Sequence, residues 1–158
     1  SEGVNNLIEL IVFINFKIMK NVLHILVSLV FLINYSCKAQ QMVQTTADVP
    51  KLKTNEQQFI NKPLKLLLKE LKPEIKTAAV TNEGWYSYFR FKFIRLDEQR
   101  KGLGNREDKV SLYIYVNGKV DWDYEKRPKG QELNWTNEDI QKYENLIVGR
   151  IKVIYPQE

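Results

Sequence analysis

The most regular hydrophobic pattern in the chain lies in residues 63–71, where leucines recur at helical spacing. The positions i, i+3, i+4 and i+7 are occupied by Leu64, Leu67, Leu68 and Leu71. This spacing places the leucines on one side of a helix, so it predicts an amphipathic helix with a single face turned to the core. Pro63 suits the first position of that helix, and Pro73 ends it.

A second helical pattern begins at Thr136, whose side chain suits the N-cap position. Asp139 follows three places later and resembles the second member of a capping box. The apolar stripe of this helix is formed by Ile140, Tyr143, Leu146 and Ile147. Gly149 is expected to end the helix, because glycine readily adopts the left-handed conformation that follows helix C-termini.

Between and after these helices, hydrophobic and polar residues alternate, which is the pattern of half-buried strands. The predicted strands are residues 75–81, 85–96, 110–116, 119–124 and 151–155. The first four are expected to form two antiparallel hairpins. The predicted fold class is therefore α+β: an amphipathic helix, a four-stranded antiparallel sheet built as two hairpins, a helix and a final strand.

The turn of the second hairpin contains Asn117 and Gly118, which are compatible with two registers. A two-residue Asn-Gly turn is the usual choice, but it would direct Asp121 and Asp123 toward the aliphatic core. A three-residue loop that ends at Gly118 directs both aspartates to water instead. Because a shift of one residue exchanges the two faces, burial outweighs the turn preference, and we predict the longer loop with positive φ at Gly118.

In this register, hydrophobic residues on the two strands lie opposite one another. The expected pairs are Ile114 with Val120, Leu112 with Trp122 and Val110 with Tyr124. Leu112 and Trp122 are therefore expected to be buried on one face. Asn82–Gly84 has the same length and the same place for glycine, so the first hairpin is expected to pair Ala79 with Ser87 and Thr77 with Phe89.

One face of the predicted sheet combines aromatic and basic side chains. The core face of segment 85–96 is expected to carry Trp85, Phe89, Phe91 and Phe93. The opposite face of the sheet is expected to carry Tyr86, Tyr88, Arg90, Lys92, Tyr113 and Tyr115. An exposed face of this kind can stack a sugar or dock a partner. If the two helices cover one face each, the tyrosines form a second core layer instead, and both alternatives are open at this point.

Two predicted loops, residues 97–108 and 125–135, are expected at the same end of the sheet. Their basic side chains could converge on a phosphate or a carboxylate. The same loops hold as many carboxylates as basic side chains, which favours ordinary solvated loops. Asp121 and Asp123 could form a catalytic carboxylate pair, but two such residues on one strand more often face solvent.

Composition excludes several kinds of site. The formal net charge is +5, yet no run of five like charges occurs, so nucleic-acid binding is not expected. The single histidine is His24 and the single cysteine is Cys37. Zinc sites of Cys and His, catalytic triads and His-ligated haem are therefore excluded after Cys37. No cofactor is expected, because Gly102–Gly104 has too few glycines for a phosphate loop.

The N-terminal part changes from basic to apolar and then to polar. Met19 and Lys20 precede the apolar run Val22–Ile33, and Cys37 follows it. This order is typical of a secretory signal, and the run is shorter than the roughly 20 residues of a membrane-spanning helix. Around Ser36–Gln40, the segment resembles the lipoprotein signals of Bacteroidota, and the resemblance covers about residues 19–41.

The resemblance implies that Cys37 becomes the mature N-terminus and carries the lipid that attaches the protein to the membrane. Surface-exported members of this group often carry acidic residues just after the cysteine. Residues 38–42 contain none, which implies that the protein faces the periplasm. The alternative for Cys37 is an ordinary buried thiol.

These assignments divide the chain into four segments. They are residues 1–18, upstream sequence read through before Met19; 19–36, the signal peptide; 37–55, a tether; and 56–158, a single α+β domain. The alternative is a membrane anchor from Leu7 to Ile33. Lys17 and Lys20 fall in the middle of that span, where a charge costs about 2.5–3.5 kcal/mol on insertion scales, so the signal is favoured.

The sequence leaves the physiological role of the exported domain undetermined. The favoured hypothesis is a non-enzymatic, lipid-anchored envelope protein that binds an unknown protein or small ligand. One alternative is a hydrolase-type enzyme that works with carboxylates alone, for which two carboxylates about 5–9 Å apart in a deep pocket would be needed. A further alternative is an inhibitor or immunity-type protein, for which the sequence carries no specific mark.

Overall fold

The computed structural model describes residues 3, 13–24 and 40–156. Residues 13–24 are helical and belong to a first unit, Ser1–Gln40, while Gln41–Glu158 forms a second compact unit. No helix among the described residues has both the length and the hydrophobicity of a membrane span. Cys37 and most of the predicted signal lie outside the described residues, so the lipoprotein signal stays a prediction.

The second unit is an α+β fold with a four-stranded antiparallel sheet, as the sequence predicts. The strands are β1 (Thr77–Glu83), β2 (Tyr86–Lys92), β3 (Ser111–Asn117) and β4 (Val148–Ile154), in the order β1-β2-β3-β4. The α-helices are α2 (Pro50–Thr54), α3 (Leu64–Leu68), α4 (Leu96–Arg100) and α5 (Asn137–Tyr143). Two 3₁₀ turns, Thr46–Asp48 and Glu56–Gln58, flank α2.

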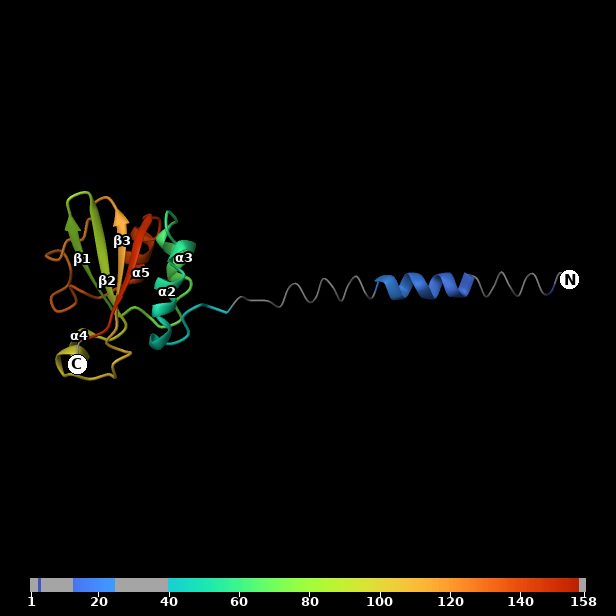
Figure 1. Cartoon of the computed structure of the whole chain (residues 1–158), viewed down its shortest axis with the longest axis horizontal. Coiled ribbons are helices and arrows are strands. Elements are labelled where there is room, and N and C mark those ends of the chain that lie inside the picture. The colour runs from blue at the N-terminus through green and yellow to red at the C-terminus, as the bar shows by residue number, and fades with distance from the viewer. Residues whose placement is uncertain (1–2, 4–12, 25–39, 157–158) are drawn as a thin grey trace. The chain divides into compact units, whose positions relative to one another are not determined.

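Helices α2, α3 and α5 gather on one side of the sheet, with α5 behind β4 in the view of Figure 1. Leu52 of α2, Leu64 and Leu67 of α3 and Tyr143 of α5 are buried. These side chains join the inward-facing strand residues Phe89, Phe91, Leu112, Ile114 and Ile151 in one core. The domain therefore has two layers, helices against sheet.

Residues 41–55, which the sequence analysis assigns to the tether, are folded into this unit. Val43, Val49 and Leu52 have no exposed surface. The Val43 amide donates to the Glu70 carbonyl oxygen over 2.9 Å, and the Lys72 amide donates to the Val43 carbonyl oxygen over 2.9 Å. Buried valines and leucine in this stretch contribute to the core, so any tether ends before Gln41.

Both predicted helices exist, but each is shorter than the sequence suggests. Helix α3 ends at Leu68, and Leu71 instead lies in a bridge with Val43. Helix α5 has the predicted N-terminus: the Asp139 amide donates to Thr136 Oγ1 over 3.3 Å, and the Thr136 amide donates to Asp139 Oδ2 over 2.9 Å. Its end at Tyr143 corrects the prediction for Gly149, which lies within β4.

The second predicted hairpin is wrong, because residues 119–124 are not a strand. Strand β3 pairs with β4, and Ile114 lies opposite Ile151 rather than Val120. The predicted burial is nevertheless correct for Leu112 and Trp122, which are buried, and Asp121 is exposed. Gly118 has a φ of +85°, as expected.

The segment after Gly118 crosses to the far edge of the sheet. The Val120 amide donates to Asn82 Oδ1 over 2.9 Å, and Asn82 Nδ2 donates to the Val120 carbonyl oxygen over 3.1 Å. The Asn82 side chain thus takes the place of a strand partner. Val120 and Trp122 reach the core beside β1. Their alternation with Asp121 and Asp123 therefore comes from the burial of every second side chain, although this segment does not pair with β3.

The first hairpin exists, but its register differs from the prediction. Val80 lies opposite Phe89 and Glu83 lies opposite Tyr86, so the turn has two residues, Gly84 and Trp85. The predicted pairing of Ala79 with Ser87 is therefore wrong. Gly84 has a φ of +59°, which is the conformation that a type II′ turn requires at its first central position. Trp85 projects from this turn and is 86% exposed, which corrects its assignment to the core face.

Candidate binding face

Alternation along β2 and β3 directs the predicted site residues away from the core. Tyr88 lies opposite Tyr115, Arg90 opposite Tyr113, and Lys92 opposite Ser111. The structure thus brings together on one face Tyr86, Tyr88, Arg90, Lys92, Tyr113 and Tyr115. We call this surface, with the neighbouring outward residues of β1 and β4, the tyrosine face.

The four tyrosine rings form a continuous ladder across β2 and β3. Ring centroids are 5.9 Å apart for Tyr86 and Tyr115, 5.1 Å for Tyr88 and Tyr115, and 5.8 Å for Tyr88 and Tyr113. The planes of each pair are tilted by 42–48°. Each such pair contributes about 0.5–1.5 kcal/mol beyond its buried area, so the ladder orders half-buried rings without a covering layer.

Strand β4 adds two basic residues that sequence analysis did not include in the face. Arg150 lies opposite Tyr115, and Lys152 lies opposite Tyr113. The Arg150 guanidinium lies over the Tyr115 ring, 5.6 Å from its centroid. The alternation of Arg150 and Lys152 with buried Ile151 was visible in the sequence, but the neighbour of β4 was not.

The charge of the tyrosine face is strongly positive. Its basic residues are Arg90, Lys92, Arg150 and Lys152, and Glu83 is the carboxylate that the pairing of the described strands places there. The Tyr86 hydroxyl donates to Glu83 over 2.6 Å, and this bond and the Glu83 charge raise the pKa of Tyr86. Burial, with a smaller contribution from Arg90, lowers the pKa of Lys92.

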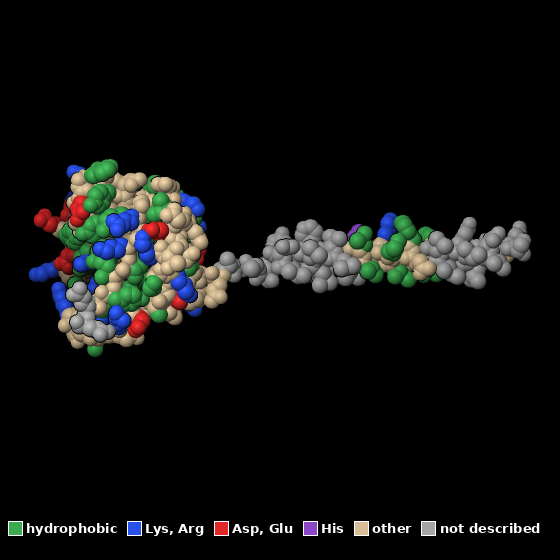
Figure 2. Space-filling model, in the orientation of Figure 1, with side chains coloured by type: hydrophobic (Ala, Val, Ile, Leu, Met, Phe, Trp, Pro, Cys, Tyr) green, Lys and Arg blue, Asp and Glu red, His purple; other side chains and the backbone are tan. Residues whose placement is uncertain are grey.

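The tyrosine face is open to solvent. Because α2, α3 and α5 all pack on the opposite side, the tyrosines do not form a second core layer. Helix α4 borders the β1 side of this face, where Leu96 and Gln99 line a small hollow with Arg90 and Lys92, and it does not reach the tyrosine rings. Figure 2 shows basic side chains beside hydrophobic ones over the strands. The tyrosine face is therefore an exposed face of the sheet and not a second core layer.

A groove of about 360 Å³ opens at the turn end of the tyrosine face. Its walls are formed by Trp85, Tyr86, Tyr115, Val116, Asn117, Gly149 and Arg150. None of these lining residues is acidic. The groove therefore combines an exposed indole, a guanidinium and an amide.

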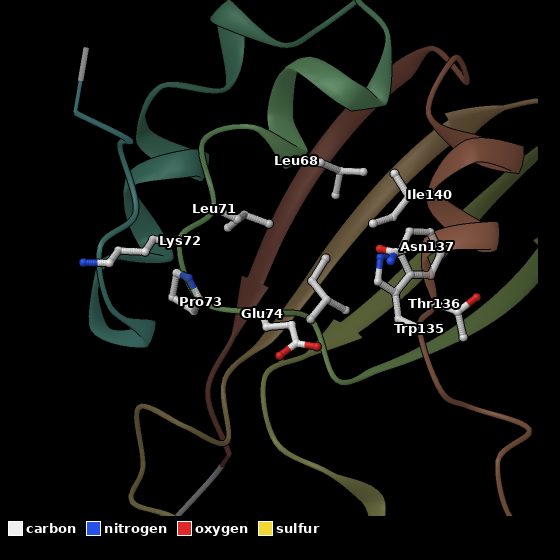
Figure 3. Close-up of a pocket in the computed structure, with 10 residues that line it drawn as sticks. Leu68, Leu71, Lys72, Pro73, Glu74, Trp135, Thr136, Asn137 and Ile140 are labelled. Atoms are coloured by element: carbon white, nitrogen blue, oxygen red, sulfur yellow. The ribbon is translucent and has the colours of Figure 1, made fainter. Parts of the chain in front are cut away.

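A second hollow of about 290 Å³ lies between α3 and α5, on the helix side (Figure 3). Leu68 of α3, Ile140 of α5 and Trp135 give it an apolar lining. It continues into a hollow of about 570 Å³ lined by Arg95, Asp97 and Arg100 on one loop and by Gly130, Gln131 and Asn134 on the other. The two loops meet at one end of the sheet, as predicted.

Opposite charges are mixed around the wider of these two hollows. Lys76 binds Glu74, and Arg95 Nε lies 3.2 Å from Asp97 Oδ1. Such exposed pairs neutralise each other locally, and Arg100 contributes to the lowered pKa of Glu132, so basic side chains are mixed with carboxylates there. This agrees with the solvated-loop interpretation of residues 97–108 and 125–135.

Several carboxylates of the folded unit form ion pairs or accept hydrogen bonds. Asp121 pairs with Lys142 at 3.2 Å, and Asp123 pairs with Lys126 at 2.9 Å, so the two aspartates have separate partners. The hydrogen bond from Lys126 lowers the pKa of Asp123. The pKa values of Asp48, Glu56, Glu132 and Asp139 are also lowered. A general acid requires the opposite shift.

Within the described part of the chain, no three potential ligands cluster for a metal ion.

One buried ion pair, missed by sequence analysis, supports the core. Arg127 Nη1 and Nη2 each donate to Asp139 over 2.9 Å, and the guanidinium lies 4.0 Å from the Trp122 ring centroid. Burial would raise the pKa of Asp139, but hydrogen bonds from Arg127 and Thr136 outweigh it and lower the pKa. The pair fastens the 125–135 loop over the core.

Comparisons with protein-family models, with curated proteins and with solved structures give no significant match to this chain.

Proposed function

We propose that the protein is a lipid-anchored cell-envelope protein whose folded unit binds a partner through the tyrosine face, without catalysis. The observation that carries this proposal is an ordered ladder of four tyrosines, flanked by four basic side chains, over which no helix of the described residues 41–156 packs. Tyrosine and arginine are enriched where proteins bind one another, because each combines a large contact area with a polar group.

The edges of the sheet favour binding through the face rather than by strand addition. On β1, the Ala78 amide donates to the Leu133 carbonyl oxygen over 2.7 Å. The Tyr124 hydroxyl accepts from the Val80 amide over 2.9 Å and donates to the Val80 carbonyl oxygen over 3.0 Å. On β4, the Val148 amide donates to the Lys62 carbonyl oxygen over 2.9 Å. These groups are the ones a strand-like ligand would need.

The carboxylate-dependent enzyme is the weaker alternative. Glu74 and Asp97 line the larger hollow, but each is held by a basic neighbour, Lys76 and Arg95 respectively. Asp121 and Asp123, the candidate pair of the sequence analysis, bind different lysines. A glycosidase-type mechanism needs one carboxylic acid with a raised pKa beside a carboxylate, and the groups described above support no such pair.

The lipid anchor at Cys37 comes from the resemblance of residues 19–41 to lipoprotein signals. Since the folded unit begins at Gln41, the attachment would leave four residues of chain, which span at most about 14 Å. A short attachment holds the folded unit close to the membrane that carries it, in the periplasm. Mass spectrometry of the protein from cells should show an acylated N-terminus at Cys37, and an intact Leu7–Ile33 segment would contradict the anchor.

The role of the tyrosine face is tested with a photo-crosslinking amino acid in living cells. Placed at Tyr113 or Tyr88, it should give a discrete crosslinked product. Placed at Gln58 on the helix side, which is exposed, it should give none. Equal products from both sides, or none from either tyrosine, would contradict a binding role for this face.

A further inference from the structure

We infer that the groove between Trp85 and Arg150 is a subsite for an acidic sugar, a pyranose ring that bears a carboxylate, within an anionic glycan. This inference rests on the proposed function and names the class of partner. Three features carry it: the position of Trp85, the guanidinium of Arg150, and the open floor at Gly149.

Trp85 is exposed although the fold provides places for tryptophan in its core. Trp122 and Trp135 stack with centroids 6.2 Å apart and planes inclined by 9°, and both contact Phe89. Trp85 instead projects from the β1–β2 turn with 86% of its surface exposed. An exposed indole adds little to folding, whereas its ring face suits the apolar C–H face of a sugar. Trp85 is therefore the platform of the subsite.

Arg150 supplies charge on the opposite wall. Its guanidinium lies over Tyr115 at 5.6 Å, which holds the cation beside the groove. A guanidinium matches a carboxylate in two parallel hydrogen bonds, so it selects an acidic ring. None of the residues lining the groove is acidic, and the nearby Glu83 is engaged by the Tyr86 hydroxyl at 2.6 Å.

Gly149 keeps the floor of the groove open. Its φ lies outside the left-handed region, so the backbone conformation there does not require glycine. A Cβ at this position would lie 3.3 Å from Asn117 Oδ1 and 3.8 Å from the Tyr115 carbonyl oxygen. A side chain at 149 would therefore crowd the Asn117 amide, which is placed to bind sugar hydroxyl groups.

The volume and the surroundings favour a glycan over a peptide. A groove of about 360 Å³ lies at the lower end of ligand sites, which span roughly 300–1,000 Å³, so it suits one unit of a polymer. The next units can follow the tyrosine face toward Arg90 and Lys152. A peptide strand would need free backbone groups at a sheet edge, and Leu133, Tyr124 and Lys62 occupy those of Ala78, Val80 and Val148.

The test uses residues 41–158, which form a compact unit with their own core. Binding of oligogalacturonate is measured by calorimetry and by tryptophan fluorescence. A neutral galacto-oligosaccharide of equal length controls for charge, and poly-L-glutamate controls for the sugar ring. We expect oligogalacturonate to bind and both controls to bind at least about tenfold more weakly, which corresponds to about 1.4 kcal/mol.

Variants locate the site. Trp85→Ala should weaken oligogalacturonate binding at least about tenfold, and Trp85→Phe should weaken it less, since a smaller ring remains. Arg150→Gln should remove the preference for the acidic over the neutral oligosaccharide. Leu103→Ala and Lys101→Gln, which change an exposed apolar and an exposed basic residue outside the groove, should leave binding unchanged.

The outcomes separate this inference from the proposed function. Absence of oligogalacturonate binding, or equal binding of poly-L-glutamate, or unchanged binding by Trp85→Ala, would overturn the acidic-sugar subsite. Tighter binding to vesicles of phosphatidylglycerol than to oligogalacturonate would overturn it too. In each case, crosslinking from positions 88 and 113 but not from position 58 would still support the binding role of the tyrosine face. Absence of crosslinking from positions 88 and 113 would contradict the proposed function itself.

Discussion

Strands β2 and β3 present two faces made from alternate residues of the same segments. The covered face carries Phe89, Phe91, Leu112 and Ile114, each with no exposed surface. The tyrosine face carries half-buried rings and basic side chains. The two faces share backbone, twist and register. Their difference arises from which side the helices cover.

The comparison shows how one small sheet separates a face that stabilises the fold from a face that stays exposed. Burial against helices gives the covered face its contribution to the free energy of unfolding, at about 25 cal/mol per Å² of apolar surface. On the tyrosine face, half-buried rings order one another through tilted contacts, and the Tyr86 hydroxyl also donates to Glu83. A residue on that face can therefore change with a smaller loss of stability.

The largest expected effect is on the covered face. Phe91→Ala should reduce the free energy of unfolding by about 4 kcal/mol, because it removes a fully buried ring that contacts Phe89 and Trp135. Tyr88→Ala, on the same strand but the other face, should cost about 1–2 kcal/mol. Urea unfolding measures both. Equal losses would show that the two faces do not differ in the way proposed here.

The buried ion pair gives the next effect. Asp139→Asn should cost about 2 kcal/mol, below the range for completely buried pairs, because Arg127 would keep its charge and lose its partner. Arg90→Gln removes an exposed charge from the tyrosine face and serves as the control. A loss from Arg90→Gln as large as that from Asp139→Asn would contradict the structural role of the pair.

The same pair predicts a dependence on pH. Since the pKa of Asp139 is lowered on folding, its stabilising contribution is present above the ordinary aspartate pKa and is lost as the pH falls through the folded-state pKa. Urea midpoints measured between neutral and acid pH should therefore fall less steeply in Asp139→Asn than in the unchanged protein. Parallel curves for the two proteins would contradict this linkage.

A smaller effect is expected at the turn that carries the chain away from β3. Gly118→Val should cost at least about 1 kcal/mol, because a β-branched residue tolerates a φ of +85° poorly. A Cβ there meets no atom within 4 Å, so the cost comes from the backbone alone. Gly118→Asn, which tolerates positive φ, should recover part of the loss. Equal stability of the valine and asparagine variants would contradict this explanation.

The smallest effect is expected at Asp121, next to buried Trp122. Asp121→Ala should change the free energy of unfolding by less than about 0.5 kcal/mol, because its contact with Lys142 is exposed to solvent. Trp122→Ala should cost several times more, about 3–5 kcal/mol. A large loss from Asp121→Ala would contradict this prediction, because it would show that the exposed Asp121 side chain itself stabilises the fold.

The tyrosine face was predictable because alternation within a strand depends only on neighbouring residues. Tyr86, Tyr88 and Arg90 share a face wherever β2 lies in the sheet. Arg150 and the groove were not predictable, since they depend on which strand lies beside β3. Trp85 was misplaced because its turn could not be distinguished from the end of a strand before the register of β1 and β2 was known.

The sequence by itself determined burial where hydrophobic and polar residues alternate within one segment, although it misplaced Trp85. Leu112 and Trp122 are buried, and Asp121 is exposed, even though the pairing from which this was deduced does not exist. Which residues are hydrophobic, and how they are spaced, is given by each short stretch of the sequence. Only the tertiary structure decided that β4 pairs with β3, that residues 41–55 join the core, and that the helices cover one face. These choices depend on contacts between distant segments, whose free energies no local pattern contains.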